Sequence, residues 1–259
     1  MINIGLAQMY CEKGAITANL ERMAGYLTEA ASRGVEILAF PEMNLTGYND
    51  PAKYPAAVIR LDGPEVAQVC ALTRGLPITL LVGLIEANPG GKPFITHIAV
   101  RDGQVLGAYR KRNVIDEEAE WFTPGGMVPI FRHGDLCFGI AICADISNEQ
   151  VFADCAQQGA QLIFEVAAPG LYGDQATRNW QTGFTWWESE CQKYLAQYAQ
   201  RYGVWIAVAT QAGRTVDEDF PGGGFVFAPD GRRLYATPDW SSGAVYLALD
   251  LEGYRALPL

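Results

Sequence analysis

The hydrophobic residues of this chain fall into short continuous runs, separated by segments in which apolar positions recur at helical spacing. The run at residues 2–8 is typical of a buried strand, and residues 17–33 predict an amphipathic helix. Thr17 is the expected N-cap of this helix, and Gly34 is expected just past its end. Residues 175–201 predict the longest helix. Further apolar runs predict strands at residues 35–40, 78–85, 94–101, 104–109, 136–143, 161–166, 204–210, 225–228 and 244–249.

Two turn signals separate some of these strands directly. Asp102-Gly103 lies between two predicted strands and indicates a hairpin, and Pro229-Asp230-Gly231 indicates a second turn. Strands that alternate with helices in some places and with hairpins in others predict an α/β sandwich with a mixed sheet, rather than a pure βαβ barrel. The chain contains no low-complexity linker and no internal repeat, so residues 1–259 are expected to form a single domain.

Composition narrows the classes of function. Hydrophobic residues make up 49% of the 259, which is enough for a large core, and the net charge of −10 argues against nucleic acid or an anionic membrane as a partner. No signal-peptide pattern and no membrane-spanning run is found, so a cytoplasmic protein is expected. The cysteines are scattered without a Cys-x-x-Cys pair, which indicates reduced thiols, and with two histidines a zinc or copper site is not expected.

The first segment that carries chemistry is Phe40-Pro41-Glu42-Met43-Asn44-Leu45-Thr46-Gly47-Tyr48. It places the carboxylate of Glu42 just past the end of a predicted buried strand, where open α/β sheets build their sites. Taken alone, Glu42 is more often an exposed carboxylate of a surface loop.

The second segment is Tyr109-Arg110-Lys111-Arg112, directly after another predicted strand. Lys111 can hold a fixed positive charge beside a reacting carbonyl group. The ordinary alternative is a solvated basic turn, which is the commoner case for an isolated lysine.

The third segment is Gly139-Ile140-Ala141-Ile142-Cys143-Ala144-Asp145, in which an apolar strand ends in a cysteine. A thiol at such a bend can project into a cleft, and the Ala144 amide is a natural donor to an oxyanion. A buried structural cysteine is an equal alternative for Cys143 alone. Asp145 is expected to be structural, satisfying nearby backbone groups or a basic side chain.

Glu42, Lys111 and Cys143 each lie at the C-terminal end of a predicted strand, and in this order they resemble the signature of the nitrilase (carbon–nitrogen hydrolase) superfamily. Gly159-Ala160 and the segment 222–231, which runs through Pro229-Asp230-Gly231, resemble further family features. The resemblance implies a nitrilase-like α-β-β-α sandwich with mixed sheets, whose subunits pair to form four layers. A homodimer or a larger even homo-oligomer is therefore expected.

The resemblance also implies a second glutamate, and Glu118, before Trp121-Phe122-Thr123-Pro124-Gly125, matches its position. A solvated acidic run is the alternative, because Asp116, Glu117 and Glu120 crowd Glu118. Besides the oxyanion donor Ala144, the side chains of Tyr48 and Asn148 are expected to contact the substrate.

The chain departs from the family pattern near these residues. The stretch from Lys111 to Glu118 is short, and Ile146-Ser147-Asn148-Glu149-Gln150 replaces the aromatic-Pro-Glu segment that often follows the nucleophile. Gly224 also replaces the usual serine. Because the segment after the nucleophile shapes the acyl pocket in relatives, the departures leave the acyl group of the substrate open.

The function that the resemblance implies is hydrolysis of a non-peptide C–N bond in a small amide or carbamoyl compound. Cys143 would be the nucleophile, Glu42 the base and Lys111 the oxyanion stabiliser, with Glu118 positioning Lys111 or the substrate. No metal or organic cofactor is required. The alternatives are a true nitrilase and an inactive family member that acts as a binding module. A papain-like pairing of the thiol with His97 or His133 has no recognisable motif, and the Gly-x-Ser-x-Gly of serine hydrolases is absent.

The predicted long helix carries Trp180, Phe184 and Trp187 at positions i, i+4 and i+7. Such a stripe is more often part of the core or of a subunit interface than a ligand cage. The stripe is therefore expected either in the core or near the expected dimer contact.

Overall fold

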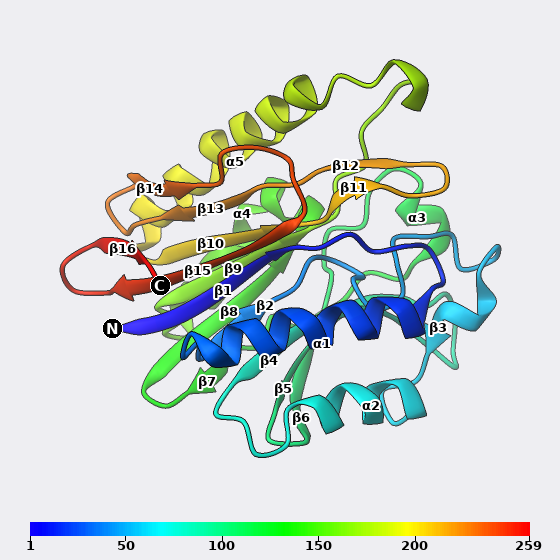
Figure 1. Cartoon of the computed structure of the whole chain (residues 1–259), viewed down its shortest axis with the longest axis horizontal. Helices are drawn as coiled ribbons and strands as arrows, with labels where there is room; N and C mark the ends of the chain where they lie inside the picture. Colours follow the sequence, from blue (N-terminus) through cyan, green and yellow to red (C-terminus); the bar gives the residue numbers. More distant parts are fainter.

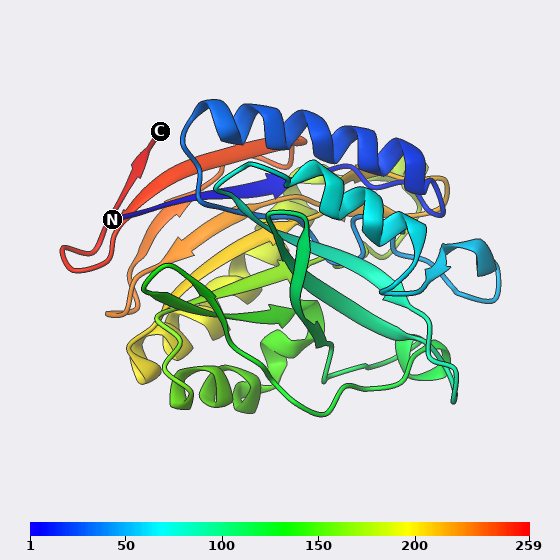
Figure 2. The ribbon, with the colours of Figure 1, turned by 90° about the horizontal axis from the view of Figure 1, so that it is seen from below.

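The computed structural model describes all residues, 1–259, and contains two large β-sheets that face each other (Figures 1 and 2). The first sheet has the order β16-β15-β1-β2-β4-β5-β6, with β3 paired to β4, and the second has the order β14-β13-β10-β9-β8-β7. A small third sheet pairs β11 with β12.

The strands of the first sheet are β1 (Ile2–Gln8), β2 (Ile37–Ala39), β3 (Val58–Ile59), β4 (Thr79–Glu86), β5 (Phe94–Arg101), β6 (Gln104–Arg110), β15 (Gly243–Asp250) and β16 (Arg255–Pro258). Those of the second sheet are β7 (Phe131–His133), β8 (Leu136–Ile142), β9 (Leu162–Ala167), β10 (Trp205–Thr210), β13 (Gly224–Phe227) and β14 (Arg233–Ala236). The small sheet is formed by β11 (Ala212–Arg214) and β12 (Asp219–Pro221).

Helices cover the outer face of each sheet, which gives the layer order α-β-β-α (Figure 2). Helices α1 (Ile16–Ser32) and α2 (Pro64–Leu72) lie on the first sheet, and α4 (Glu149–Gln157) and α5 (Trp180–Tyr202) lie on the second. A short helix, α3 (Glu118–Trp121), and the 3-10 turns η1 (Pro55–Ala57), η2 (Cys143–Ser147) and η3 (Gln175–Thr177) complete the elements. The predicted α/β sandwich with mixed sheets is confirmed.

The directions of the strands decide which loops can meet. Strands β1, β2 and β4 are parallel neighbours, as are β8, β9 and β10. Strand β6 runs antiparallel to β5, which runs antiparallel to β4, so β6 points the same way as β2 and β4. The segments that follow β2 and β6 therefore leave the first sheet at the same end of its strands.

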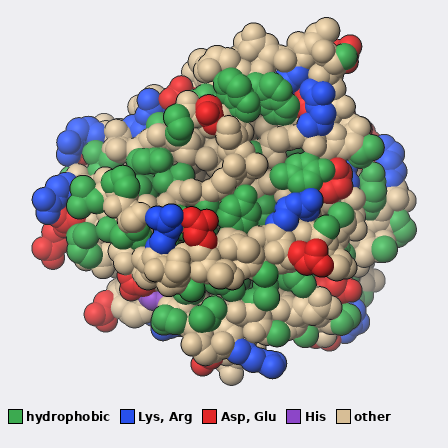
Figure 3. Space-filling model, viewed as in Figure 1, with side chains coloured by type: hydrophobic (Ala, Val, Ile, Leu, Met, Phe, Trp, Pro, Cys, Tyr) green, Lys and Arg blue, Asp and Glu red, His purple; other side chains and the backbone are tan.

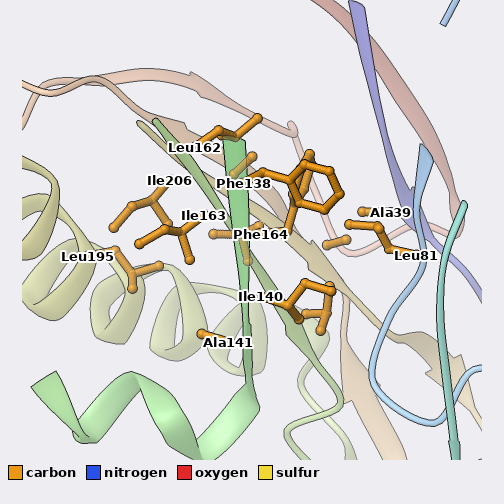
Figure 4. Close-up of a cluster of buried hydrophobic side chains, with 14 of the residues drawn as sticks. Ala39, Leu81, Phe138, Ile140, Ala141, Leu162, Ile163, Phe164, Leu195 and Ile206 are labelled. Atoms are coloured by element: carbon orange, nitrogen blue, oxygen red, sulfur yellow. The ribbon is translucent and has the colours of Figure 1, made fainter. Parts of the chain in front are cut away.

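The inter-sheet core follows the alternation of side chains along β8 and β9. Phe138 packs edge-on against Phe164, with ring centroids 5.8 Å apart, and both rings point toward the first sheet, where Ala39 and Leu81 lie (Figure 4). Ile163 points the other way, toward the helical layer that contains Leu195. Successive side chains of a strand point to opposite faces, so a strand buried on both faces needs apolar residues at successive positions.

The boundaries of two helices differ from prediction. Helix α1 begins at Ile16, and Ala15 occupies the N-cap position without a side-chain hydrogen bond, so the prediction of Thr17 as N-cap was wrong. Gly34 has the left-handed φ of 68° expected just past the helix. Helix α5 begins at Trp180 rather than at 175, because the Asn179 side chain accepts a 3.1 Å bond from Thr182 N and caps it there.

Two of the three residues of the aromatic stripe belong to the core of this chain, and the third, Trp180, is half-buried beneath the guanidinium of Arg214. Phe184 and Trp187 are buried, and Trp187 Nε1 donates a 2.8 Å hydrogen bond to Thr210 Oγ1 of β10. The large aromatic side chain left exposed on α5 is Trp186, at 43%. The stripe thus gives no independent support to a subunit contact, and the even oligomer stays a prediction.

The surface fits the acidic composition. On the face shown in Figure 3, basic and acidic side chains are interspersed and no continuous basic area is visible. None of the helices combines the length and the apolar character needed to cross a bilayer.

Candidate active site

Lys111, which directly follows β6, lies between two carboxylates. Its Nζ is 2.8 Å from Glu42 Oε1 and 2.7 Å from Glu118 Oε1. Glu42 comes from the segment after β2, and Glu118 is the first residue of α3. The structure therefore brings together three side chains that the sequence singled out.

The segment that carries Glu42 is seated against a glycine of β4. A Cβ atom at Gly83 would lie 2.4 Å from the backbone N of Met43 and 2.8 Å from the carbonyl oxygen of Pro41, so only glycine fits. Gly83 N donates to Asn44 Oδ1 at 2.8 Å, which fixes the turn after Glu42. Met43 itself has a φ of 48°, an uncommon conformation for a residue with a side chain.

The other oxygen of Glu42 is also held. Ala168 N, just after β9 of the second sheet, donates to Glu42 Oε2 at 3.1 Å. Glu42 thus joins Lys111 of one sheet to the backbone of the other, and its carboxylate can hardly rotate.

Cys143 directly follows β8 and begins the turn η2 with a φ of 46°. A left-handed conformation at a non-glycine residue costs on the order of 1–3 kcal/mol and persists only where the surroundings enforce it. Here Asp145 enforces it, because Asp145 Oδ2 accepts hydrogen bonds from Ile142 N at 2.9 Å and from Tyr109 Oη at 2.7 Å. Its Oδ1 accepts from Asn113 N at 2.8 Å, so Asp145 is structural as expected, although no basic side chain takes part.

Burial of this group sets its protonation. Lys111 and Glu42 are almost fully excluded from water, with 1% and 0% exposure. Burial raises the pKa of Glu42 to about 7, against the opposing effects of Lys111 and, more weakly, of the Cys143 thiol. Burial alone would lower the pKa of Lys111, but the charges of Glu42 and Glu118 outweigh it and raise that pKa well above the usual value.

Cys143 is protonated in the resting site. Burial, followed by the charge of Glu42, raises the pKa of its thiol well above the ordinary value. A neutral thiol beside a carboxylate that titrates near neutrality is an arrangement in which the carboxylate can take the proton as the sulfur attacks.

The three further predicted site residues have different positions. Tyr48 Oη donates to Glu118 Oε1 at 3.0 Å, so it fixes the second glutamate, and its ring meets Phe220 edge-on. Ala144 lies in the nucleophile turn, and its carbonyl oxygen accepts from Asn113 Nδ2 at 2.6 Å. Asn148 is the N-cap residue of α4, and its side chain makes no hydrogen bond to the other site residues. The expected contacts of Tyr48, Ala144 and Asn148 with substrate stay predictions.

Sequence reasoning missed Tyr109, Asn113 and Glu165. The first two hold Asp145, but a tyrosine in a strand and an asparagine in a short loop carry no distinguishing pattern. Glu165 had a usable signal, because it is the one charged residue in the apolar run that forms β9. It is fully buried, and neither of its carboxylate oxygens has a hydrogen-bond partner.

The geometry of metal binding is not found in the structure, since no three His, Cys, Asp or Glu side chains come together in a way that could hold an ion. The expectation that the reaction needs no cofactor stays a prediction.

Comparison with known proteins shows to which family the chain belongs. Residues 3–259 match the family model described as carbon–nitrogen hydrolase. The chain is 23% identical over 256 residues to the glutamine-dependent NAD(+) synthetase of Acinetobacter baylyi, covering 97% of this chain but only 45% of the synthetase. It is 29% identical over 175 residues to the formamidase of Pseudomonas syringae pv. tomato, covering 63% of this chain and 51% of that enzyme.

Among solved structures, an amidase from Nesterenkonia sp. AN1 superposes with a TM-score of 0.81 at 22% identity, covering 96% of this chain and 93% of the amidase. That similarity concerns the fold. The chain spans about half the length, or less, of the NAD(+) synthetases it matches, so their complete activity is not transferable. The match of the family model over nearly the whole chain is sufficient, and the chain belongs to the carbon–nitrogen hydrolase family of the nitrilase superfamily.

Proposed function

We propose that this protein hydrolyses the C–N bond of a small amide or carbamoyl compound, with Cys143 as nucleophile, Glu42 as general base and Lys111 as oxyanion stabiliser. The observation that carries the proposal is the position of Lys111 Nζ, within 2.8 Å of both Glu42 and Glu118 in a buried site beside Cys143. Buried ionisable groups with strongly shifted pKa values cluster at functional sites.

In the first step, the sulfur of Cys143 attacks the carbonyl carbon and its proton passes to Glu42. The carbonyl oxygen becomes an oxyanion and needs donors. An ammonium group has three N–H donors, and Lys111 uses two of them on Glu42 and Glu118. The third is left for the oxyanion, together with the backbone N–H of Ala144, and one such donor is worth about 3 kcal/mol.

In the second step, the tetrahedral intermediate collapses, and the C–N bond breaks. Glu42 returns its proton to the leaving nitrogen, so ammonia or an amine departs and a thioester remains on Cys143. Water then attacks the thioester, Glu42 takes its proton, and the acid is released with the thiol restored. A carboxyl group whose pKa is about 7 suits both directions of this transfer.

A primary amide is the substrate class that we favour. The names of the formamidase and of the glutamine-dependent synthetases both refer to such compounds. The Cys143-Ala144-Asp145 sequence also supports an amide, because true nitrilases usually have a Cys-Trp-Glu sequence at the nucleophile. A Glu-to-Gln mutant of the Nesterenkonia amidase has been crystallised with acrylamide added at its active-site cysteine, which provides an analogy for the reactivity of Cys143.

The test is ammonia release from a panel of small primary amides, carbamoyl compounds and the nitriles matched to them. Turnover of amides with a higher kcat/KM than of the matched nitriles is the expected result, and Cys143→Ala is the control for contaminating activity. A consistent preference for nitriles would favour a nitrilase, and no turnover of any compound by a protein with a reactive Cys143 would favour a binding module.

A further inference from the structure

Glu165 of β9 is a buried acid that the proposed mechanism does not use. In the parallel pair of β8 and β9 it lies opposite Ala141, two residues before Cys143. Figure 4 shows Ile163 on the side of the helical layer and Phe164 on the opposite side of the sheet. Because side chains alternate along a strand, Glu165 lies on the same side as Ile163. It therefore lies beneath the nucleophile turn, not in the space between the two sheets.

The two acids beneath this turn differ in their environment. Asp145 accepts three hydrogen bonds, from Ile142 N, Asn113 N and Tyr109 Oη. Glu165 has none, although it is fully buried. An unpaired carboxylate is very unfavourable in such a place, so the group takes up a proton instead.

The surroundings reinforce this protonation. Burial raises the pKa of Glu165 well above the usual value, and the negative charge of Asp145 adds to the effect. The backbone N–H of Cys143 faces Glu165 and opposes this shift only weakly, as a polar contact outside normal hydrogen-bond geometry. The ionisable groups that face Glu165 come from four segments: Cys143 and Asp145 of η2, Glu42 after β2, Lys111 after β6 and Cys191 of α5.

We infer that Glu165 is a positioning residue of the nucleophile turn that works as a neutral acid, and that its ionisation limits the reactivity of Cys143 at alkaline pH. As a neutral acid, Glu165 gives the N–H of Cys143 a weak polar contact without placing a charge beneath the sulfur. Once ionised, it adds a negative charge beside Asp145 and Cys143, and this charge opposes both the thiolate and the oxyanion. The inference rests on the proposed role of Cys143 as the nucleophile.

The experiment is alkylation of Cys143 by iodoacetamide from mildly acidic to alkaline pH, located by peptide mass. Cys143 is the one half-buried cysteine of the chain, and the other five are buried, which favours selective reaction. Three proteins are compared: the unsubstituted protein, Glu165→Gln, which stays neutral and polar, and Glu165→Met, which is neutral and apolar at similar length. Glu86→Gln serves as the control, because Glu86 is a buried glutamate that pairs with Arg110 and is not among the main charges that act on Cys143.

In Glu165→Gln we expect the half-maximal rate at a pH lower by about one unit, the effect of removing a nearby like charge. At neutral pH, Glu165→Met is expected to react about fivefold more slowly than Glu165→Gln, which corresponds to one lost polar contact. The Glu86→Gln curve should superpose on that of the unsubstituted protein.

Superposable curves for Glu165→Gln and the unsubstituted protein would overturn the inference, and so would equal rates for the Met and Gln variants. If Glu165→Met does not fold, the Glu165→Gln curve still decides. Alkylation needs no substrate, so failure to hydrolyse any amide would count against the proposed function alone.

Discussion

The Nζ of Lys111 lies 2.8 Å from Oε1 of Glu42, and both side chains are almost completely buried, although they come from segments 69 residues apart. A buried ion pair contributes little net stability when intact, but removing one partner leaves an uncompensated charge. Substitution of either residue of the pair is therefore expected to change activity, and loss of the cation is also expected to lower stability.

Replacing Cys143 by alanine is expected to abolish amide turnover while the fold stays intact. The side chain is half-buried, so the lost packing is small. Turnover is measured as ammonia release, and folding by circular dichroism and a thermal melt. Residual activity in a folded Cys143→Ala protein, above that of a mock preparation, would contradict the role of this thiol.

Glu42→Gln is expected to lower kcat by on the order of 100-fold or more, because the amide cannot accept the thiol proton. The fold should tolerate it, because Lys111 keeps Glu118 as a partner at 2.7 Å. A carboxyl group whose pKa is raised on folding costs stability as pH rises above its unfolded value, near 4.5, and this cost levels off above about 7. In urea melts, the free energy of unfolding of Glu42→Gln should therefore rise relative to that of the unsubstituted protein as the pH increases from 5 to 8. An unchanged kcat would remove Glu42 from the mechanism.

The activity itself should depend on pH through the same group. Since Glu42 acts as the base in its ionised form, kcat/KM is expected to rise as pH increases through about 7. The measurement is the pH profile of kcat/KM for one amide in buffers of constant ionic strength. A profile that is flat from pH 5 to pH 8 would show that ionisation of Glu42 does not control the reaction.

Lys111→Met is expected to lose activity and also about 3–5 kcal/mol of stability, because two buried carboxylates lose their cation. Acid should restore part of the loss, since protonation neutralises both groups. The triple variant with Glu42→Gln and Glu118→Gln is the matched control and should recover much of the stability without recovering turnover. Equal stability of Lys111→Met and the unsubstituted protein at neutral pH would argue against a charged cluster.

Gly83→Ala tests the packing beneath Glu42. A Cβ atom there would lie 2.4 Å from Met43 N, so the Glu42 segment must shift, at a cost of about 2 kcal/mol or more. Gly25→Ala on α1 is the control, because a Cβ there has no atom within 4 Å and should stabilise the helix by up to about 1 kcal/mol. Urea denaturation of the two variants measures the difference, and equal stability would show that the turn can move freely.

Glu42, Lys111 and Cys143 could be predicted as site residues because each follows the end of a predicted strand. Each follows an apolar run, so its place at the edge of a sheet follows from the hydrophobic pattern of the chain alone. Tyr109 and Glu165 lie inside strands, and their importance depends on which neighbours the register brings beside them.

Local capping was less predictable than strand position. Thr17 has the chemistry of an N-cap, but the chain enters α1 through tertiary contacts. Asn19 Nδ2 donates to the carbonyl oxygens of Glu12 and Leu45, at 2.9 and 3.2 Å, and these bonds fix the first turn from outside the helix. Side-chain propensity at one position could not reveal such long-range bonds.

The proposed catalytic set is divided between the two sheets: Glu42 and Lys111 follow strands of one, and Cys143 follows a strand of the other. During folding, a chain that has formed only one sheet holds either a base and a cation without a thiol, or a thiol without its base. In the proposed mechanism, the thiol of Cys143 therefore meets its base only when the two sheets pack together, so activation of this cysteine depends on completed folding.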